Sequence, residues 1–346
     1  MRLTRYAAAA AAFGVVLAGC SSEAGQQAEE QADNTVAVET DVEFEAGTTM
    51  AELAEAGTMT VGVKFDQPGF GLLNPSGEPE GFDVQIATII AANLGIAPED
   101  IEFVESVSAN REPFIQNGTV DIVVATYTIN DARKQLVDFA GPYYEAGQDI
   151  MVAAGNPEGI AGPDDLAGKN VCSVEGSTPA QNIRDNYPEA TLTLFDVYSK
   201  CADALNNGQV DAVTTDNVIL TGLVAGNPEG FELVGNPFTE EPYGIGLSLG
   251  DTEFRNFIND TLEASFEDGS WAEAWDATAG AITGEDAPSR PRSTATDPHD
   301  RSRPVLTRAG REPSCPLAEP SREEAPCSSS WTTSTSSGTH SSTPWV

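Results

Sequence analysis

Basic side chains are scarce in this sequence, so each one that remains is a candidate for chemistry. The chain of 346 residues has 17 Lys and Arg against 54 Asp and Glu, a formal net charge of -37. Residues 57–283 contain only eight, namely Lys64, Arg111, Arg133, Lys134, Lys169, Arg184, Lys200 and Arg255. Weak surface ion pairs explain those in polar segments, which are Lys134, Lys169, Arg184 and Arg255. Lys64, Arg111 and Arg133 border cleft-forming patterns instead, and an arginine there can direct two N–H groups onto a carboxylate.

Catalytic and metal-binding residues are weakly represented in the same region. Both histidines, His299 and His340, lie near the C-terminus, and no cluster of metal-ligand residues stands out before them. We therefore expect a protein that is not an enzyme and that has no metal and no cofactor. A carboxylate base such as Glu175 leaves an enzyme as an alternative. The strongly negative charge excludes nucleic acid as a partner, because its phosphates would be repelled.

Short apolar strands alternate with helical segments, which predicts an α/β fold with mainly parallel sheets covered on both faces. The expected strands are residues 59–63, 101–104, 121–125, 149–153, 169–174, 192–195, 211–215 and 243–247. Helices are expected over residues 80–94, 113–116, 164–166, 178–186, 199–206, 254–266 and 270–278.

An internal repeat divides these elements into two lobes. The pattern Asn-Gly-x-Val-Asp-x-Val spans residues 117–123 and recurs at residues 207–213. We assign residues 57–145 and 241–283 to lobe 1 and residues 146–240 to lobe 2. This arrangement requires two crossing strands between the lobes and leaves a cleft where they face each other.

The candidate site is expected in that cleft. Ligands of open α/β sheets bind beyond the carboxyl ends of the strands, here after Val63, Ala125, Val174 and Thr215. Asn130 and Asp131 are good helix N-cap residues, and the N–H groups of a helix starting there would attract an anion. The alternative is that they only cap this helix and that Arg133 pairs with an acid.

Two neighbouring segments carry a family resemblance. Residues 125–133 read Ala-Thr-Tyr-Thr-Ile-Asn-Asp-Ala-Arg, and residues 137–144 read Val-Asp-Phe-Ala-Gly-Pro-Tyr-Tyr. Together they resemble the polar amino-acid-binding proteins of bacterial ABC importers, family 3 of the extracellular solute-binding proteins. Residues 106–118 are similar to the glutamate/aspartate-binding branch of this family. The resemblance covers roughly residues 55–280.

The resemblance implies a two-lobed periplasmic-binding-protein fold of type II with a two-strand hinge. It also implies a monomer that captures an amino acid, most simply glutamate, and delivers it to an ABC permease in the membrane. A sensory binding module and a dehydratase-type enzyme on the same fold are the alternatives.

Individual binding residues follow from the matched positions. Thr126, Thr128 and Arg133 match the groups that hold the ligand's α-carboxylate. Asp216 matches the carboxylate that accepts the α-ammonium, unless it only caps the following helix, and Asp66 is a weaker candidate for the same role. Three further residues are expected at the pocket, namely Phe70 as a shield, Thr178 as a hydroxyl, and Tyr198 in place of a histidine of the branch.

Selectivity is expected from Lys64, Ser108 and Arg111, which match positions around a second carboxylate. Lys64 replaces an arginine of the family, and the alternative for Arg111 is that it caps a sheet edge. Burial of a ligand carboxylate without a partner costs several kcal/mol. Two converging cations would therefore favour glutamate, and glutamine or another polar amino acid is the alternative.

The N-terminus resembles a lipoprotein export signal. Arg2 and Arg5 precede an apolar stretch, residues 6–18, which is too short to span a bilayer. Cys20 follows Leu-Ala-Gly, which resembles the bacterial lipobox, so residues 1–19 are expected to be the signal peptide and Cys20 the site of lipid attachment. The protein would then be extracytoplasmic and anchored to the cell membrane. An ordinary signal peptide with a chance cysteine is the alternative.

The segments that flank the lobes have few apolar residues. Residues 20–56 are expected to be a flexible tether. Residues 284–346, with seven arginines and no lysine, are expected to be disordered and resemble the product of a frameshift. Cys172 and Cys201 are the only cysteines between these two segments. We expect a disulfide between them, because an exported chain meets an oxidising environment. Two buried thiols are the alternative.

Overall fold

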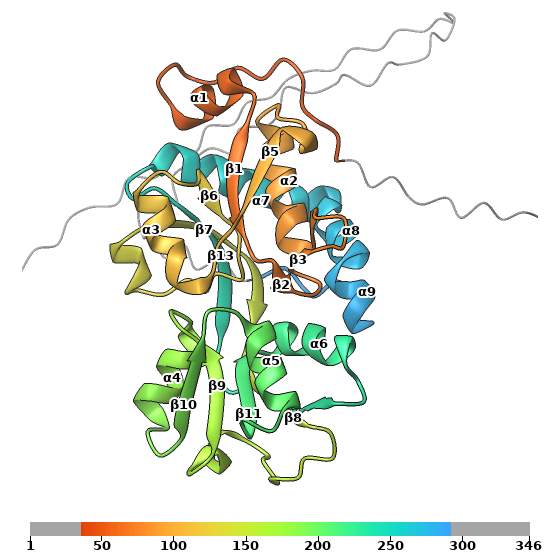
Figure 1. Cartoon of the computed structure of the whole chain (residues 1–346). Coiled ribbons are helices and arrows are strands. Elements are labelled where there is room, and N and C mark those ends of the chain that lie inside the picture. The colour runs from red at the N-terminus through yellow and green to blue at the C-terminus, as the bar shows by residue number, and fades with distance from the viewer. Residues whose placement is uncertain (1–35, 292–346) are drawn as a thin grey trace, which may run out of the picture. The chain divides into compact units, whose positions relative to one another are not determined.

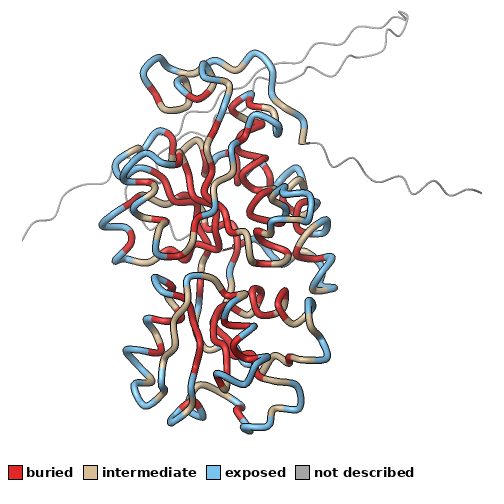
Figure 2. Tube along the Cα trace, viewed as in Figure 1, coloured by how far each residue is buried: buried red, intermediate tan, exposed pale blue. Residues whose placement is uncertain are grey.

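The computed structural model of the protein describes residues 36–291, which all belong to one contact unit of the chain. The expected signal peptide and Cys20 lie outside the described residues, as do both histidines and most of the C-terminal segment. Figure 1 shows the described residues as two α/β lobes, and buried residues are concentrated along the strands of both sheets (Figure 2).

Lobe 1 is built on a five-stranded sheet with the order β5-β1-β6-β13-β7. Its strands are β1 (Met59–Val63), β5 (Ile101–Glu105), β6 (Ile122–Val123), β7 (Asp138–Ala146) and β13 (Glu241–Leu247). β1 pairs in parallel with β5 and β6, whereas β13 pairs antiparallel with β6 and β7. One strand therefore runs against the other four. A small sheet precedes the first long helix and consists of β2 (Asp66–Gln67), β3 (Gly71–Leu73) and β4 (Pro79–Glu80).

The helices of lobe 1 are α1 (Thr49–Ala56), α2 (Phe82–Asn93), α3 (Arg111–Gln116), α7 (Thr252–Asp268), α8 (Ser270–Ala277) and α9 (Ala279–Thr283). Short 3-10 turns are η1 (Pro98–Asp100), η2 (Ser108–Asn110) and η3 (Arg133–Gln135). α2 is apolar on nearly all sides and is buried accordingly. Its Phe82 packs edge-to-face on Trp271 and Trp275, at 5.5 Å between ring centroids in both pairs.

Lobe 2 repeats the same strand pattern in the order β10-β9-β11-β8-β12. Its strands are β8 (Gln148–Ala153), β9 (Asn170–Val174), β10 (Thr191–Phe195), β11 (Ala212–Asp216) and β12 (Phe231–Leu233). β9 pairs in parallel with β10 and β11, and β8 runs antiparallel to β11 and β12. The helical elements are η4 (Pro163–Leu166), α4 (Thr178–Asn186), α5 (Tyr198–Asn206) and α6 (Asn217–Gly226). The predicted two-lobed α/β fold is confirmed, but the sheets are mixed rather than mainly parallel, because each has two parallel and two antiparallel strand pairings.

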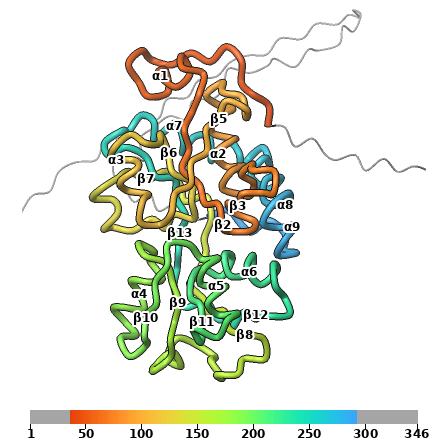
Figure 3. Tube along the Cα trace, in the orientation of Figure 1, coloured from red at the N-terminus to blue at the C-terminus, as the bar shows by residue number. Residues whose placement is uncertain are grey.

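Two crossing segments connect the lobes. The chain leaves lobe 1 through β7, forms lobe 2, and returns through β13 (Figure 3). The crossings touch at Gly147, where a Cβ would lie 2.7 Å from the Thr239 carbonyl oxygen. The backbone N–H of Gln148 donates to the Thr239 hydroxyl at 3.0 Å. The hinge is therefore a paired structure rather than two independent linkers.

The expected flexible tether is too long, because its second half packs on lobe 1. Thr48 caps α1, with its side chain accepting a hydrogen bond from the Ala51 N–H. The Phe44 ring packs edge-on against Phe257 of α7, at 5.6 Å between centroids. The backbone N–H of Glu39 donates to the Ala92 carbonyl at the end of α2. A few apolar residues in a polar segment are enough to bind it to the core.

The boundary expected at residue 284 is also too early. The indole Nε1 of Trp275 donates to the Glu285 carbonyl at 3.0 Å, and Ala287 packs against the core. Arg290 forms an ion pair with Glu263. Residues 284–291 therefore belong to the folded lobe, and residues 292–346 lie outside the described part.

Lobe 2 contains a disulfide between β9 and α5. Cys172 and Cys201 are linked, with their Cα atoms 5.5 Å apart and 29 positions apart in sequence. This is the pairing that the sequence predicts. Among residues 36–291, none of the helices has the length and apolar character needed to cross a bilayer.

Candidate functional site

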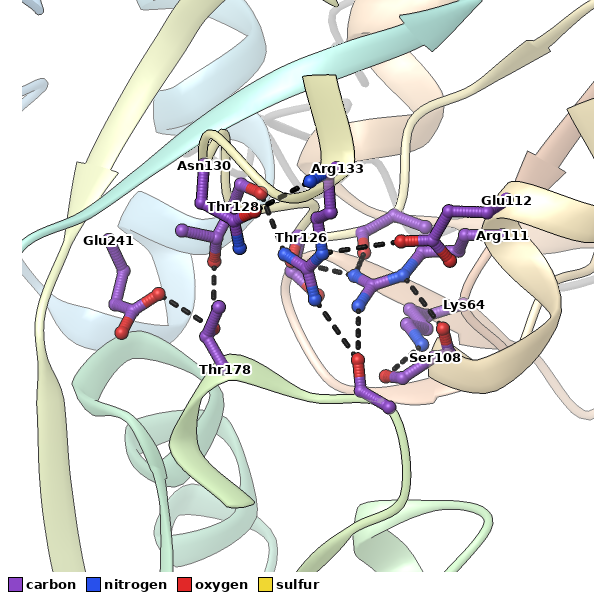
Figure 4. Close-up of polar contacts among 12 residues, drawn as sticks. Lys64, Ser108, Arg111, Glu112, Thr126, Thr128, Asn130, Arg133, Thr178 and Glu241 are labelled. Carbon is purple, nitrogen blue, oxygen red and sulfur yellow. Dashed lines mark hydrogen bonds and ion pairs between the residues drawn. The ribbon is translucent and has the colours of Figure 1, made fainter. Parts of the chain in front are cut away.

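Three of the eight basic residues in the segment 57–283 are buried, and they meet between the two lobes (Figure 4). Lys64 follows β1 and is 3% exposed, Arg111 opens α3 and is 2% exposed, and Arg133 opens η3 and is 7% exposed. The five others lie nearer the surface, each with an acidic partner: Lys134 with Asp131, Lys169 with Glu158, Arg184 with Glu175, Lys200 with Asp196 and Arg255 with Asp138. The separation into buried and surface cations follows the sequence prediction for seven of the eight residues, and Lys200, for which no environment was predicted, joins the surface group.

Arg111 is surrounded by neutral acceptors. Its Nη1 donates to the Ala125 and Thr126 carbonyls at 3.1 and 3.2 Å, and its Nε donates to the Ser108 carbonyl at 3.2 Å. Its guanidinium carbon lies 4.3 Å from the centroid of the Tyr127 ring. Arg111 thus caps the chain beyond β6, which was the alternative for this residue, but it also reaches lobe 2. In the described part of the chain no carboxylate lies within ion-pair distance of it.

Lys64 is the second cation without an acidic partner among residues 36–291. Its Nζ donates to the Ser108 hydroxyl at 2.9 Å, which joins two of the predicted selectivity residues. Burial holds the pKa of Lys64 well below its ordinary value, and the nearby charge of Arg111 lowers it further. An added anion at this point would restore the charge of the ammonium group.

Arg133 has one acidic neighbour, with its Nε 3.3 Å from Glu112 Oε1. Its Nη1 donates to the Thr128 carbonyl at 2.6 Å. Burial, and then the charge of Arg111, lowers the pKa of Arg133 to about 10. Arg133 therefore does pair with an acid, as the alternative interpretation of this residue expected.

The helix expected to start at Asn130 or Asp131 is wrong. Only the single turn η3 forms, with the Asn130 side chain accepting the Arg133 N–H at 2.9 Å. The chain enters β7 at Asp138, which leaves no room for a longer helix. Attraction for an anion here comes from the arginine side chains, because one turn has no appreciable dipole.

Two glycines allow lobe 2 to touch lobe 1 through the backbone. The Gly176 carbonyl accepts from Arg133 Nη2 at 3.0 Å and from Arg111 Nη2 at 3.4 Å. Gly176 has φ +78°, and a Cβ there would lie 2.8 Å from the Ala109 Cα. A Cβ on Gly222 would lie 2.4 Å from the Pro68 carbonyl oxygen. The backbones of the two lobes are therefore in close contact at both glycines, Gly176 and Gly222.

Thr126 is held in a strained conformation by residues that sequence reasoning missed. Its φ of 43° is unusual for a β-branched residue. The Asp83 carboxylate accepts its N–H at 2.8 Å, and the Gln67 side-chain oxygen accepts its hydroxyl at 3.0 Å. Burial raises the pKa of Asp83 to about 7, while its bond from the Tyr143 hydroxyl opposes the rise. The available signal was the position of Asp83 as the single charged residue of helix α2, in its first turn.

Asp216 provides a buried acceptor on the lobe 2 side. It precedes α6 but makes no capping bond, so the alternative of a helix cap does not describe its side chain. Its Oδ2 accepts the Tyr243 hydroxyl at 2.6 Å, and its Oδ1 has no partner among the described residues. Burial, and then the charge of Glu241, raises the pKa of Asp216 to about 8. The carboxylate is thus poised to accept a positively charged group.

A second buried carboxylate, Glu241, was also missed by sequence reasoning. It is 4% exposed and lies at the start of β13 in the hinge. Its Oε2 accepts the Thr178 hydroxyl at 2.7 Å, and its Oε1 accepts the Thr239 hydroxyl at 2.9 Å. The Thr178 hydroxyl also lies 3.2 Å from that of Thr128 across the lobe interface.

The remaining candidates lie at the edge of the site or in the core. Asp66 Oδ2 accepts the N–H groups of Tyr198 and Ser199 at 2.7 and 3.2 Å, so this carboxylate from lobe 1 caps α5 of lobe 2. Phe70 is 1% exposed and packs edge-to-face on Phe82 in the aromatic core. Tyr198 is 3% exposed, and burial raises its pKa to about 12.

Glu175, the alternative catalytic base, is exposed and pairs with Arg184 at 2.8 Å. The described residues also contain no cluster of His, Cys, Asp and Glu that could hold a metal ion. The side chains at the lobe interface are charged and hydroxyl groups that contact one another directly across it.

Known proteins are similar to this chain over about two thirds of its length. The glutamate-binding protein GluB of Corynebacterium efficiens is 41% identical over 237 residues, which are 66% of this chain and 80% of that protein. The ABC transporter glutamine-binding protein GlnH of Bacillus subtilis is 42% identical over 229 residues, 66% of this chain and 83% of that protein.

A solved structure and a family model cover the same region. The solute receptor for L-cysteine of Neisseria gonorrhoeae has a TM-score of 0.66 and 30% identity, over 70% of this chain and 98% of that one. Residues 59–277 match the model of the bacterial extracellular solute-binding proteins, family 3. Because this match covers more than half of the chain, the chain belongs to family 3 of the bacterial extracellular solute-binding proteins.

Proposed function

We propose that the protein captures L-glutamate between its lobes and delivers it to an ABC permease. The observation that carries this proposal is the presence of two buried cations, Lys64 and Arg111, without a carboxylate in ion-pair distance among residues 36–291. Uncompensated buried charge is costly. A ligand with two carboxylates compensates it, and the named relatives GluB and GlnH bind glutamate or glutamine.

The proposed pose follows the charges. Arg133 takes the α-carboxylate, while Lys64, Ser108 and Arg111 take the side-chain carboxylate. Asp216 takes the α-ammonium on its unpartnered Oδ1. Thr126, Thr128 and Thr178 line the α end. The sequence prediction assigned Thr126 and Thr128 to the α-carboxylate, but the Thr126 proton is already given to Gln67, so its hydroxyl oxygen is left as an acceptor.

Glutamine is the second candidate. The lowered pKa of Lys64 makes the loss of its proton easier, and a neutral amine can donate to an amide oxygen as well as to a carboxylate. GlnH of Bacillus subtilis, at 42% identity, is named for glutamine. The choice between the two ligands therefore depends on the protonation of Lys64 in the complex.

The proposal includes an extracytoplasmic protein held to the cell membrane by lipid on Cys20. The Leu-Ala-Gly-Cys sequence at residues 17–20 supports it. Mass spectrometry of the protein purified from membranes tests this part, because a diacylglyceryl group on Cys20 is expected and an unmodified cysteine would contradict it. We propose transport rather than sensing or catalysis, since GlnH is named as an ABC transporter component.

Calorimetric titration of the purified protein with a panel of amino acids tests the ligand. L-Glutamate is expected to bind at one site, at least about tenfold more tightly than L-glutamine, which corresponds to about 1.4 kcal/mol. Arg111→Ala should narrow this difference, and Lys134→Ala, a surface cation, should leave it unchanged. An unchanged difference in Arg111→Ala would overturn the assignment of the side-chain carboxylate.

A further inference from the structure

Three side chains form a chain of hydrogen bonds across the lobe interface (Figure 4). Thr128 lies in lobe 1, Thr178 opens α4 of lobe 2, and Glu241 opens β13 in the hinge. The two hydroxyl oxygens are 3.2 Å apart, and the Thr178 hydroxyl is 2.7 Å from Glu241 Oε2. The chain therefore exists only when both lobes and the hinge meet.

The direction of these hydrogen bonds follows from counting protons. An ionised carboxylate only accepts, so Thr178 donates its single proton to Glu241. Thr178 then has no proton for Thr128, and Thr128 must be the donor in the bond between the two hydroxyls. The Thr128 oxygen keeps free lone pairs but no proton, which suits an ammonium group and not a carboxylate.

We infer that Glu241 is a positioning residue that acts through Thr178 to hold the Thr128 hydroxyl as an acceptor for the ligand's ammonium group. The inference rests on the proposed function and adds a residue that selects for a free amine. Glu241 itself is not placed in contact with the ligand.

The surroundings of Glu241 keep this direction constant. Its Oε1 is held by the Thr239 hydroxyl at 2.9 Å, on the same crossing segment. No basic side chain of residues 36–291 lies within ion-pair distance of it, so nothing competes with the hydroxyls for its oxygens. Its charge also raises the pKa of Asp216 and of Arg133, which lie around the α end of the proposed ligand.

A double-mutant cycle in the full chain tests the relay. Thr178→Val keeps the shape and removes the hydroxyl, and it should weaken L-glutamate binding about tenfold in calorimetry, while Thr178→Ser should restore near wild-type affinity. Glu241→Leu should weaken binding to a similar degree. The double variant should bind L-glutamate no more weakly than the single variant with the lower affinity, because both substitutions break the same relay. Glu240→Leu, at the exposed neighbouring position, is the matched control and should bind normally.

A second readout separates positioning from general damage. L-2-Hydroxyglutarate carries a hydroxyl in place of the ammonium and can donate or accept, so Thr178→Val should weaken it less than threefold. Equal losses for both ligands, or additive losses in the cycle, would overturn the relay. If the wild type binds neither L-glutamate nor L-glutamine, the proposed function fails. In that case the melting temperatures of the same variants, measured without ligand, test whether the relay exists. Additive losses in melting temperature would again overturn it.

Discussion

The two lobes share one strand pattern but supply different charged groups to the interface. In each sheet, three parallel strands are followed by one antiparallel strand and a fifth strand, in corresponding order. Lobe 1 supplies all three buried cations, Lys64, Arg111 and Arg133. Lobe 2 and the hinge supply the carboxylates Asp216 and Glu241. The shared topology sets where side chains emerge, and the residue types at those points set what they attract.

The lobes also differ in what stabilises them. Lobe 1 has an aromatic core in which Phe82 and Tyr144 pack on Trp275. Lobe 2 has a disulfide between β9 and α5. The interface thus joins a lobe that has the buried cations and a large aromatic core to a lobe that has Asp216 and a covalent cross-link.

Removal of a buried lobe 1 cation should have the largest effect on ligand affinity. Arg133→Ala loses the bonds to Thr128 and Gly176 and leaves Glu112 without its partner. We expect L-glutamate affinity to fall at least about 100-fold, roughly 3 kcal/mol, as for other broken buried charge pairs. Calorimetry measures this loss, with Arg184→Ala, a surface arginine of lobe 2, as the control. Retention of affinity within threefold would show that the buried cations do not hold the ligand.

Removal of the disulfide tests the difference in stabilisation. Replacement of both Cys172 and Cys201 by Ser should lower the free energy of unfolding by about 2–4 kcal/mol, because the bridge closes a loop of moderate length. Chemical denaturation measures the change. Reduction of the wild-type protein should give the same shift, and the Ser variant should not respond to reductant. A wild-type protein that is insensitive to reduction contradicts the prediction.

The pH dependence of binding tests the lobe 2 carboxylate. Asp216 must be ionised to hold an ammonium, and its pKa is raised to about 8. The carboxyl is therefore largely protonated below pH 8, and affinity for L-glutamate should rise as pH increases from 6 to 8, by at most about tenfold per pH unit.

The Asp216→Asn variant isolates this effect. Lys64 titrates in the opposite sense in both proteins, since its lowered pKa favours the neutral amine at higher pH. The difference between the two pH profiles therefore reports Asp216, together with the groups facing it, which are Glu241, Tyr243, Tyr198, Arg111 and Arg133. Parallel profiles would remove Asp216 from ammonium binding.

The smallest effect is expected at the edge of the interface. Asp66→Ala removes the carboxylate that caps α5 from the opposite lobe. The loss of a helix cap costs about 1 kcal/mol, so L-glutamate should bind severalfold more weakly with an unchanged preference over glutamine. Asp131→Ala, at an exposed carboxylate of lobe 1, is the control. A changed preference would return Asp66 to direct ligand contact.

The sequence predicted the parts of the site that depend on residue type and strand ends. The scarcity of cations singled out Lys64, Arg111 and Arg133, and the repeat at residues 117–123 and 207–213 indicated two lobes. Contacts that depend on tertiary packing were not predictable. Asp83 and Glu241 look like ordinary acids in an acidic chain, and only the fold shows that both are buried.

Local signals also failed where tertiary structure overrides them. Asn130 and Asp131 favour a helix start, but the chain must enter β7 within a few residues. Phe44 is a single aromatic residue in a polar segment, yet its contact with Phe257 fastens that segment to lobe 1. Neither outcome can be derived from composition or periodicity.

The glycines at positions 176 and 222 determine how far the lobes can approach. Both stand where the missing methyl group would strike backbone atoms of the other lobe. Main-chain atoms cannot change rotamer to relieve a clash, so the methyl group of an alanine at either position would hold the two lobes apart. The protein would then fold and keep its charged side chains, but its two lobes could not come fully together. The substitution would thus separate lobe closure from electrostatic attraction of the ligand.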